Sequence, residues 1–270
     1  MAAASSGIRF DDQVVVVVGA GPGLGATLAG RFAHAGADVA VVARSTSSLD
    51  VSSKAVRAAS TESLSIAADI TVPEQASRMA DTVIERFGQI DVLVNVAFGV
   101  APKRNVLDMD AEGLELWRRV VEIGGYGTLL ACRYVAPYMV RRGRGAIVNV
   151  TSMSSRIGFA GRSEYAVGKA QAHKIAHALA DELGPVGVRV NCVAPGHIWS
   201  EQLAVYYHAR AENLGVDYET VLAGFTDRAA LRRIVTNDEV ANAVLFLASD
   251  LASGITGAVL DVNAGQLFTP

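Results

Sequence analysis

Five consecutive valines, Val14–Val18, lead directly into a glycine-rich stretch, Gly19–Gly25, near the start of the chain. An uninterrupted run of β-branched residues is typical of a strand buried on both faces, as strands are in a parallel sheet. The residues that follow, 26–35, predict a helix. A buried strand, a glycine turn and a helix in this order predict an α/β fold in which strands and helices alternate.

The glycine turn also predicts a site for an anion. Glycines let the backbone approach a pyrophosphate closely, and the N-terminus of a helix offers free N–H groups and a partial positive charge. The spacing Gly19-x3-Gly23-x-Gly25 differs from G-x-G-x-x-G, the usual dinucleotide fingerprint. Taken alone, the motif is also compatible with a plain structural turn. Its place at the first strand-to-helix turn favours a dinucleotide site.

A second motif lies in the middle of the chain, where Lys169 follows Tyr165 at a spacing of four residues. On a helix these two positions share one face. An ammonium beside a phenol favours the phenolate and lowers the pKa of the phenol, so that Tyr165 can exchange a proton with an alcohol or a ketone. Ser152, thirteen residues before Tyr165, could steady the substrate oxygen. The alternative, for the pair alone, is an ordinary contact on a helix surface.

The remaining pattern predicts one domain of alternating strands and helices that covers residues 12–270. The expected strands are 14–18, 38–43, 63–67, 90–95, 146–151, 188–193 and 257–262. The expected helices are 24–35, 47–58, 74–87, 110–141, 163–183 and 237–248. We expect residues 1–11 to be disordered. Residues 199–228 have no regular pattern and follow a strand end, where ligands bind in such folds, so they predict a substrate lid or a structural insertion.

Composition narrows the range of functions. The net charge of −3 gives no electrostatic reason to expect nucleic-acid or membrane binding. Cys132 and Cys192 belong to no metal-binding or disulfide pattern, and we expect buried thiols in a reducing compartment. Residues 13–30 are uncharged, but five glycines and Pro22 argue against a membrane-spanning helix. Residues 1–7 lack the features of a signal peptide. These observations predict a soluble, cytoplasmic protein without a metal.

Together, these motifs resemble the short-chain dehydrogenase/reductase family, in its branch of compact single-domain NAD(P)-dependent oxidoreductases. That family carries T-G-x3-G-x-G near its start, a Ser-Tyr-Lys constellation and a later P-G motif. Here Val18 replaces the threonine, and Asn191–Ile198 contains the P-G segment. The resemblance extends from about Asp12 to Gly265. It implies a single Rossmann-like domain, with a doubly wound, seven-stranded parallel sheet and helices on both faces.

The resemblance also implies roles for individual residues. Tyr165 would donate or accept the proton, Lys169 would hold the nicotinamide ribose hydroxyls and lower the pKa of Tyr165, and Ser152 would bind the carbonyl or carbinol oxygen. Asp69 matches the residue that meets the adenine ring. The implied cofactor-binding residues are Gly19, Gly21, Gly23, Leu24, Gly25, Arg44, Ser45, Asp69, Ile70, Asn95, Ala97, Tyr165, Lys169, Pro195, Gly196, Ile198 and Ser200.

Two residues depart from the family pattern. Phe98 stands where the family's N-N-A-G has glycine, and Gly124 stands where the family has a further catalytic asparagine, when Trp117 and Gly127 are aligned. Two adjacent glycines weaken a helix by about 0.5–1 kcal/mol each. Gly124 could therefore open the helix, present its backbone carbonyl and leave room for the substitution Gly124→Asn. The alternative is a broken proton relay and slow catalysis.

Cofactor choice depends on the end of the second strand, where an acidic residue would bind both ribose hydroxyls. The chain has Ala43 there, and Arg44 and Ser45 follow it. A cation and a hydroxyl suit a 2′-phosphate, which favours NADP(H); a solvated Arg44 leaves NAD(H) open. The expected substrate pocket is apolar and suits a lipophilic ketone or secondary alcohol. Its expected residues are Phe98, Met153, Phe159, Trp199 and Tyr206.

The predicted function is metal-independent hydride transfer between NADP(H) or NAD(H) and a hydrophobic ketone or secondary alcohol, with Tyr165 as the acid/base group. The alternative is a dinucleotide-binding sensor or scaffold with little turnover, which Gly124 and Phe98 support. Helices 110–141 and 163–183 carry more Ala, Val, Leu and Gly than one buried stripe requires. Because family members pair these helices in symmetric assemblies, we expect a homotetramer, with a dimer as the fallback.

Overall fold

The computed structural model describes residues 7–59, 61–99 and 101–268, and these contain one parallel sheet of seven strands. The strands are β1 (Val14–Val18), β2 (Asp38–Ala43), β3 (Ser63–Ala67), β4 (Val92–Asn95), β5 (Gly145–Val150), β6 (Val188–Pro195) and β7 (Val259–Val262). Their order is β3-β2-β1-β4-β5-β6-β7. The order reverses between β1 and β4, and ligands of such sheets bind beyond the carboxyl ends of the strands at this reversal.

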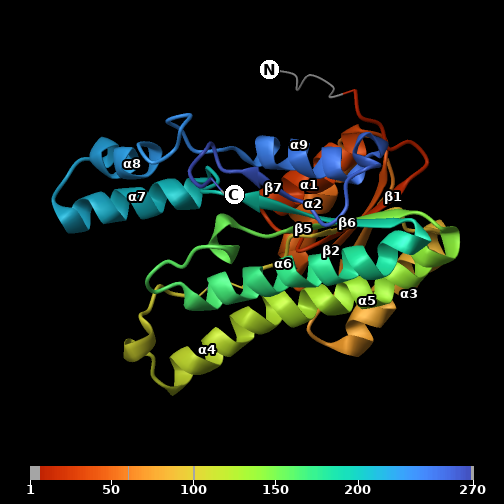
Figure 1. Cartoon of the computed structure of the whole chain (residues 1–270), viewed down its shortest axis with the longest axis horizontal. Helices are drawn as coiled ribbons and strands as arrows, with labels where there is room; N and C mark the ends of the chain where they lie inside the picture. The colour runs from red at the N-terminus through yellow and green to blue at the C-terminus, as the bar shows by residue number, and fades with distance from the viewer. Residues whose placement is uncertain (1–6, 60, 100, 269–270) are drawn as a thin grey trace.

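Helices cover both faces of the sheet, as Figure 1 shows. One layer contains α1 (Leu24–His34), α2 (Thr46–Arg57) and α9 (Asn237–Ala248). The other contains α3 (Pro73–Phe87), α4 (Ala111–Glu122), α5 (Thr128–Arg142) and α6 (Ser163–Leu183). The predicted doubly wound α/β fold is confirmed.

The valine run explains how the two layers are held. Val15 and Val17 of β1 pack into the cluster with α1 and α9, whereas Val14, Val16 and Val18 pack into the opposite cluster with α3 and α5. Successive side chains of a strand point to opposite faces. A central strand with a helical layer on each side therefore has no position at which a polar residue would reach water.

Two predicted elements differ in the structure. The expected helix 110–141 consists of α4 and α5, joined by a π-helical turn over Ile123–Gly127. Residues 199–228 are not irregular: they contain α7 (Glu201–Leu214) and α8 (Tyr218–Thr226), which project together from the sheet (Figure 1). Ser200 and Asp217 cap these two helices by accepting hydrogen bonds from Leu203 N and Thr220 N. The caps were the local sequence feature that could have revealed the helices.

The N-terminal segment is more ordered than predicted. Residues 1–6 lie outside the described residues, but Phe10 is buried and packs edge-on against Phe32 of α1, with ring centroids 4.9 Å apart. Its backbone N–H donates to Ala35 O at 2.8 Å. The prediction of disorder is therefore wrong for residues 7–11, because burial of an aromatic side chain holds this segment on the core.

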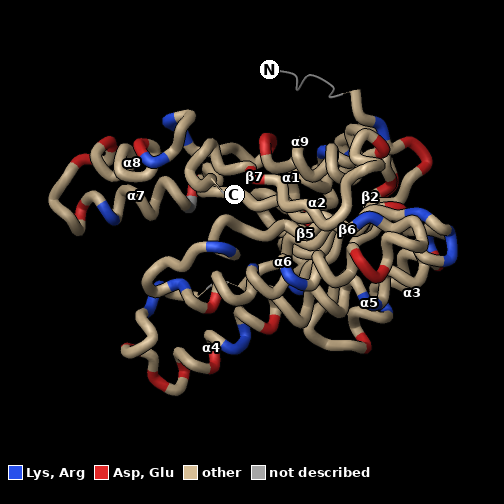
Figure 2. The backbone as a smooth tube through the Cα atoms, viewed as in Figure 1, with Lys and Arg blue, Asp and Glu red and all other residues tan. Residues whose placement is uncertain are grey.

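Two further expectations concern the cysteines and the surface. Cys132 and Cys192 are buried free thiols, as predicted, and burial raises the pKa of each to about 12. Figure 2 shows acidic and basic residues interspersed along the chain. Within the described residues, no helix combines the length and the apolar character that crossing a bilayer would need.

Candidate active site

The three predicted catalytic residues lie at the carboxyl edge of the sheet. Ser152 follows the end of β5, and Tyr165 and Lys169 occupy the first two turns of α6. The Ser152 hydroxyl lies close enough to the Tyr165 phenol to lower its pKa. The Ser152 hydroxyl also accepts from Ser154 N at 3.1 Å, which fixes its position. Thr151, the preceding residue, is buried, and its hydroxyl donates to Val193 O at 3.1 Å.

The electrostatics of Tyr165 differ from the expectation. Burial raises the pKa of the phenol, while the nearby Ser152 hydroxyl and the positive charge of Arg162 lower it, and the net shift is upward. The cation that acts on Tyr165 is thus Arg162, at the N-terminus of α6, and not Lys169. The guanidinium of Arg162 is held by Ala101 O, to which Nη1 donates at 2.8 Å. The expected lowering of the Tyr165 pKa by Lys169 is wrong in this structure.

Lys169 is turned toward the sheet, which is the physical reason for that difference. Its side chain is 5% exposed, and Nζ donates to Val150 O at 2.8 Å and to Ala97 O at 3.5 Å. These carbonyls lie at the carboxyl ends of β5 and β4. Burial lowers the pKa of the Lys169 ammonium to about 8, so the ammonium remains the main form at neutral pH.

Gly124 lies in the π-helical turn, as expected of a glycine pair that opens a helix. Its carbonyl accepts from Thr128 Oγ1 at 2.8 Å. A Cβ at Gly124 would meet Gly168 Cα of α6 at 2.9 Å and could not be accommodated without moving backbone. The expected room for Gly124→Asn is therefore absent. Gly124 and Gly168 instead let α6 approach the π-helical turn closely, one residue before Lys169.

The glycine turn fits a dinucleotide. Gly19 has φ 96°, and a Cβ there would collide with the backbone of Ala97. A Cβ at Gly25 would lie 2.5 Å from Gly19 O. Gly23, the N-cap of α1, has open space around it, and no side chain of the described residues caps this helix. The N-terminus of α1 is therefore accessible to an anion such as a pyrophosphate, and the backbone around it is closely packed.

The expected adenosine end of the site contains an exposed cation. Arg44 follows β2 and is exposed, and its charge contributes to lowering the pKa of Asp69. Asp69 accepts from the backbone and hydroxyl of Thr71 at 3.0 and 2.7 Å. Ser45 caps α2 by accepting from Ser48 N at 3.3 Å. The structure thus places Arg44, Ser45 and Asp69 at one end of the predicted site.

Several other predicted cofactor-binding residues form hydrogen bonds or a β-bridge within the protein. Asn95 is buried, and its Nδ2 donates to Asn149 Oδ1 of β5 at 2.9 Å, so its side chain belongs to the sheet. The Ser200 hydroxyl accepts from Leu203 N as the cap of α7. Ile198 pairs with Val235 in an isolated parallel bridge. Further members of this set are backbone or apolar positions: Leu24 opens α1, Ile70 is buried, Pro195 ends β6, and Gly196 follows it.

Of the predicted substrate-pocket residues, Met153 is buried, whereas Phe98, Phe159, Trp199 and Tyr206 are exposed. Phe98 lies against Tyr165 and Lys169, the two residues of α6 predicted to be catalytic. His197 is partly buried against Phe225, with ring centroids 4.9 Å apart. His197 thereby connects the P-G segment to α8, a contact that no local motif indicates.

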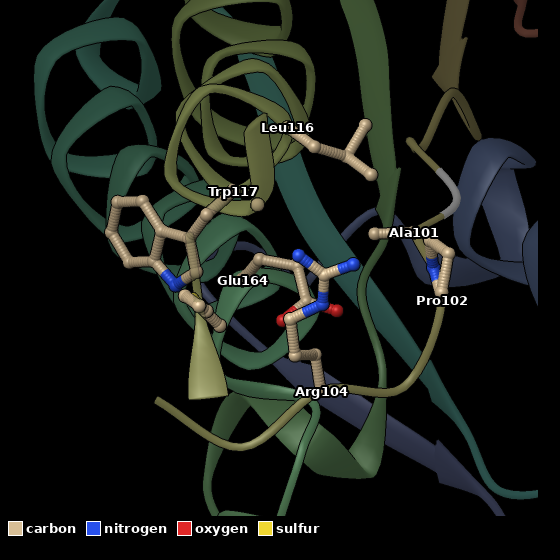
Figure 3. Close-up of a pocket in the computed structure, with 8 residues that line it drawn as sticks. Ala101, Pro102, Arg104, Leu116, Trp117 and Glu164 are labelled. Atoms are coloured by element: carbon tan, nitrogen blue, oxygen red, sulfur yellow. The ribbon is translucent and has the colours of Figure 1, made fainter. Parts of the chain in front are cut away.

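A small cavity of about 20 Å³ lies between α4 and the N-terminus of α6, with room for about one water molecule (Figure 3). Glu164 lines it and is 2% exposed, and its Oε1 has no hydrogen-bond partner among the described residues. The other lining residues are Ala101, Pro102, Arg104, Met109, Gly113, Leu116 and Trp117. None of the five predicted substrate-pocket residues is among them. Nor do the described residues contain three or more His, Cys, Asp or Glu side chains grouped to hold a metal ion.

The sequence of this chain is similar to those of known oxidoreductases over almost its whole length. A family model described as enoyl-(acyl carrier protein) reductase matches residues 19–266. The short-chain reductase protein NovJ of Streptomyces niveus is 35% identical over 255 residues, which are 94% of each chain. The cis-4-hydroxycyclohexanecarboxylate dehydrogenase of Sinomonas cyclohexanicum is 34% identical over 96% of this chain and 98% of the relative.

Solved structures show the same relationship. The crystal structure of levodione reductase superposes with a TM-score of 0.87, at 30% identity, over 96% of this chain and 98% of that chain. The matched region includes the glycine turn, Ser152, Tyr165, Lys169 and the P-G segment. This protein is an oxidoreductase of the short-chain dehydrogenase/reductase family, whose members use NAD(P).

Proposed function

We propose that this protein transfers a hydride between NADP(H) and a lipophilic ketone or secondary alcohol, with Tyr165 as the acid/base group. The observation that carries the proposal is the proximity of the Ser152 hydroxyl to the Tyr165 phenol, one helical turn from the buried Lys169. This pair lies at the same edge of the sheet as the open N-terminus of α1. The proposed chemistry uses no metal ion.

The protein's part in the reaction follows from these positions. When bound, the nicotinamide supplies or accepts the hydride. The Ser152 hydroxyl lies close enough to Tyr165 to lower its pKa, so one substrate oxygen can be held by both hydroxyls. In reduction Tyr165 donates its proton to that oxygen, and in oxidation it accepts the proton. Because burial raises the pKa of Tyr165, the phenol is protonated at neutral pH, which suits reduction.

The preference for NADP(H) rests on Arg44. Ala43 stands where an acidic residue would repel a 2′-phosphate, and the exposed guanidinium of Arg44 follows it directly. Ser45 and the N-terminus of α2 lie directly after it and add a hydroxyl and a favourable helix dipole. Lys169 would hold the nicotinamide ribose at the other end of the cofactor.

A lipophilic substrate is supported by the exposed aromatic side chains of Phe98, Phe159, Trp199 and Tyr206. The Sinomonas relative is named for a hydroxycyclohexanecarboxylate, which is a cyclic secondary alcohol. We assign α7 and α8 the role of a substrate lid, because they begin directly after the P-G segment at the carboxyl end of β6.

We also propose a homotetramer, with a dimer as the fallback. Leu114, Tyr126, Leu129 and Val167 are exposed apolar residues on α4, the π-helical turn, α5 and α6. Apolar residues on adjoining helices suit a symmetric, isologous contact. Light scattering at micromolar concentration should give a mass of four or two chains, and a monomer mass would contradict the assignment.

The function is tested by a screen of hydrophobic cyclic and aryl ketones with NADPH and with NADH, followed by the loss of absorbance of the reduced nicotinamide. We expect turnover of at least one ketone, faster with NADPH. Cofactor binding without turnover of any ketone or of the corresponding alcohols would indicate a sensor or scaffold. Failure to bind either cofactor would contradict the assignment of the glycine turn.

A further inference from the structure

Phe98 occupies an unusual place beside the catalytic pair. It follows Ala97 directly, beyond the carboxyl end of β4. Its ring meets the Tyr165 ring edge-on, with centroids 6.2 Å apart and planes at 84°. Lys169 Nζ lies 5.8 Å from the centroid of the same ring. One side chain thus contacts both residues of the proton-transfer machinery, at a position where glycine would contact neither.

The backbone and the ring act on Lys169 together. The Ala97 carbonyl lies 3.5 Å from Nζ, the Val150 carbonyl lies at 2.8 Å, and the Phe98 ring faces the same ammonium. The negative face of an aromatic ring attracts a cation, most strongly where water is excluded. Ala97 and Phe98 therefore hold the ammonium with a carbonyl and a ring from two consecutive residues.

The rest of the Phe98 ring is available to a ligand. Phe98 is 54% exposed, although Tyr165 and Lys169 lie against it. A large apolar side chain that remains half exposed beside a catalytic hydroxyl provides an apolar wall for the part of a substrate next to its carbonyl. Such a wall favours substrates that carry a flat or cyclic apolar group at that position.

We propose that Phe98 is a positioning and specificity-determining residue. It keeps the side chains of Tyr165 and Lys169 in position and selects carbonyl compounds with an apolar ring beside the reacting carbon. The selectivity part rests on the proposed function. The contact with Lys169 stands on geometry alone and needs no knowledge of the substrate.

The kinetic test compares Phe98→Leu, Phe98→Tyr and Phe98→Gly with the wild-type enzyme on a cyclic ketone and on a small open-chain ketone. Leucine keeps apolar volume but has no ring, so we expect kcat to fall about tenfold for both ketones. Tyrosine restores the ring and should recover most of that loss. Glycine should additionally raise KM for the cyclic ketone, while KM for the open-chain ketone changes little.

Phe87→Leu is the matched control. Phe87 ends α3, at the opposite edge of the sheet, and Arg86 lies 5.1 Å from its ring centroid, so this variant also removes a ring from beneath a cation. It should leave kcat and KM unchanged. Equal kcat values for wild type and Phe98→Leu would overturn the positioning role, and an equal rise of KM for both ketones in Phe98→Gly would overturn the selectivity.

A second readout does not depend on turnover. Labelling by a small amine-reactive reagent, followed by peptide mass spectrometry, reports the access of reagent to each lysine. Lys54, Lys103 and Lys174 are exposed and serve as internal references. Phe98→Gly should label Lys169 about tenfold faster relative to these references, and Phe87→Leu should not. Unchanged labelling would overturn the contact with Lys169. A wild-type enzyme that turns over no ketone would instead overturn the proposed function and with it the selectivity.

Discussion

The carboxyl edge of the sheet and the α7–α8 projection are built differently. At the edge, Gly19 and Gly124 leave no space for a Cβ, and Lys169 is fixed by carbonyls at the ends of two strands. The projection is held mainly by its own small core around Tyr207, whose hydroxyl is buried without a hydrogen-bond partner among the described residues. The comparison indicates that the residues proposed for proton transfer lie in the closely packed region and that the projection tolerates change.

The largest effect is expected at the edge, for Tyr165→Phe. Only the transferable proton is lost, so kcat should fall by about 10²–10⁴-fold, the usual contribution of general acid–base catalysis. Steady-state kinetics on a ketone found in the screen gives kcat, and nicotinamide fluorescence gives the cofactor Kd. The Kd should remain close to the wild-type value. A variant that retains the wild-type kcat would remove Tyr165 from the mechanism.

A matched pair of helical glycines compares the two regions directly. A Cβ at Gly124 would meet the backbone of Gly168 at 2.9 Å, whereas a Cβ at Gly224 in α8 would meet nothing within 4 Å. Gly124→Ala should therefore lower the free energy of unfolding by about 1–3 kcal/mol through overpacking. Gly224→Ala should raise it by about 0.5–1 kcal/mol through helix propensity. Urea unfolding measures both, and effects of the same sign would refute the contrast in packing.

Arg44→Asp tests the predicted site for the adenosine part of the cofactor, at the carboxyl edge of the sheet. Replacing attraction to a 2′-phosphate by repulsion should shift the ratio of the Kd values for NADPH and NADH toward NADH by about tenfold or more. Arg57→Asp, at the exposed C-terminal end of α2, makes the same change of charge and should leave the ratio unchanged. The same ratio in Arg44→Asp and wild type would mean that Arg44 does not contact the phosphate.

The smallest effect is expected in the projection, for Tyr207→Phe. The Tyr207 side chain is fully buried, and its ring stacks on Phe225 with centroids 4.8 Å apart. Removing a buried hydroxyl that lacks a partner should raise the free energy of unfolding by about 1 kcal/mol and leave kcat unchanged. Thermal unfolding at constant pH tests this, and a lower Tm would show that the hydroxyl has a stabilising partner.

The same contrast explains what the sequence could predict. Some positions in the fold restrict which residue type can occupy them. Gly19 must be glycine because it lies beside Ala97, and Val14–Val18 must be apolar because they lie between two helical layers. The fold and the hydroxyl pair of Ser152 and Tyr165 were predictable for this reason. That Arg162, and not Lys169, is the cation acting on Tyr165 could not be predicted from the sequence. This depends on which backbone carbonyls lie within reach of each side chain.

Contacts between residues that are distant in the sequence could not be predicted from local sequence patterns either. The expected room at Gly124 disappears because Gly168, forty-four residues later, brings α6 into contact with it. The helices α7 and α8 were missed because their buried apolar side chains form a small cluster apart from the core of the sheet, around Tyr207, Ala211 and Val221. The burial of Phe10 depends in the same way on Phe32, which is distant in the sequence but adjacent in the fold.

The central claim is that a hydride passes directly between the nicotinamide and the substrate carbon beside Tyr165. The most direct measurement uses reduced cofactor with deuterium in place of both C4 hydrogens, a ketone found in the screen, and mass spectrometry of the alcohol product. The account predicts that the alcohol carries deuterium on its carbinol carbon, and that Tyr165→Phe forms the same labelled product much more slowly. An alcohol without deuterium would contradict it.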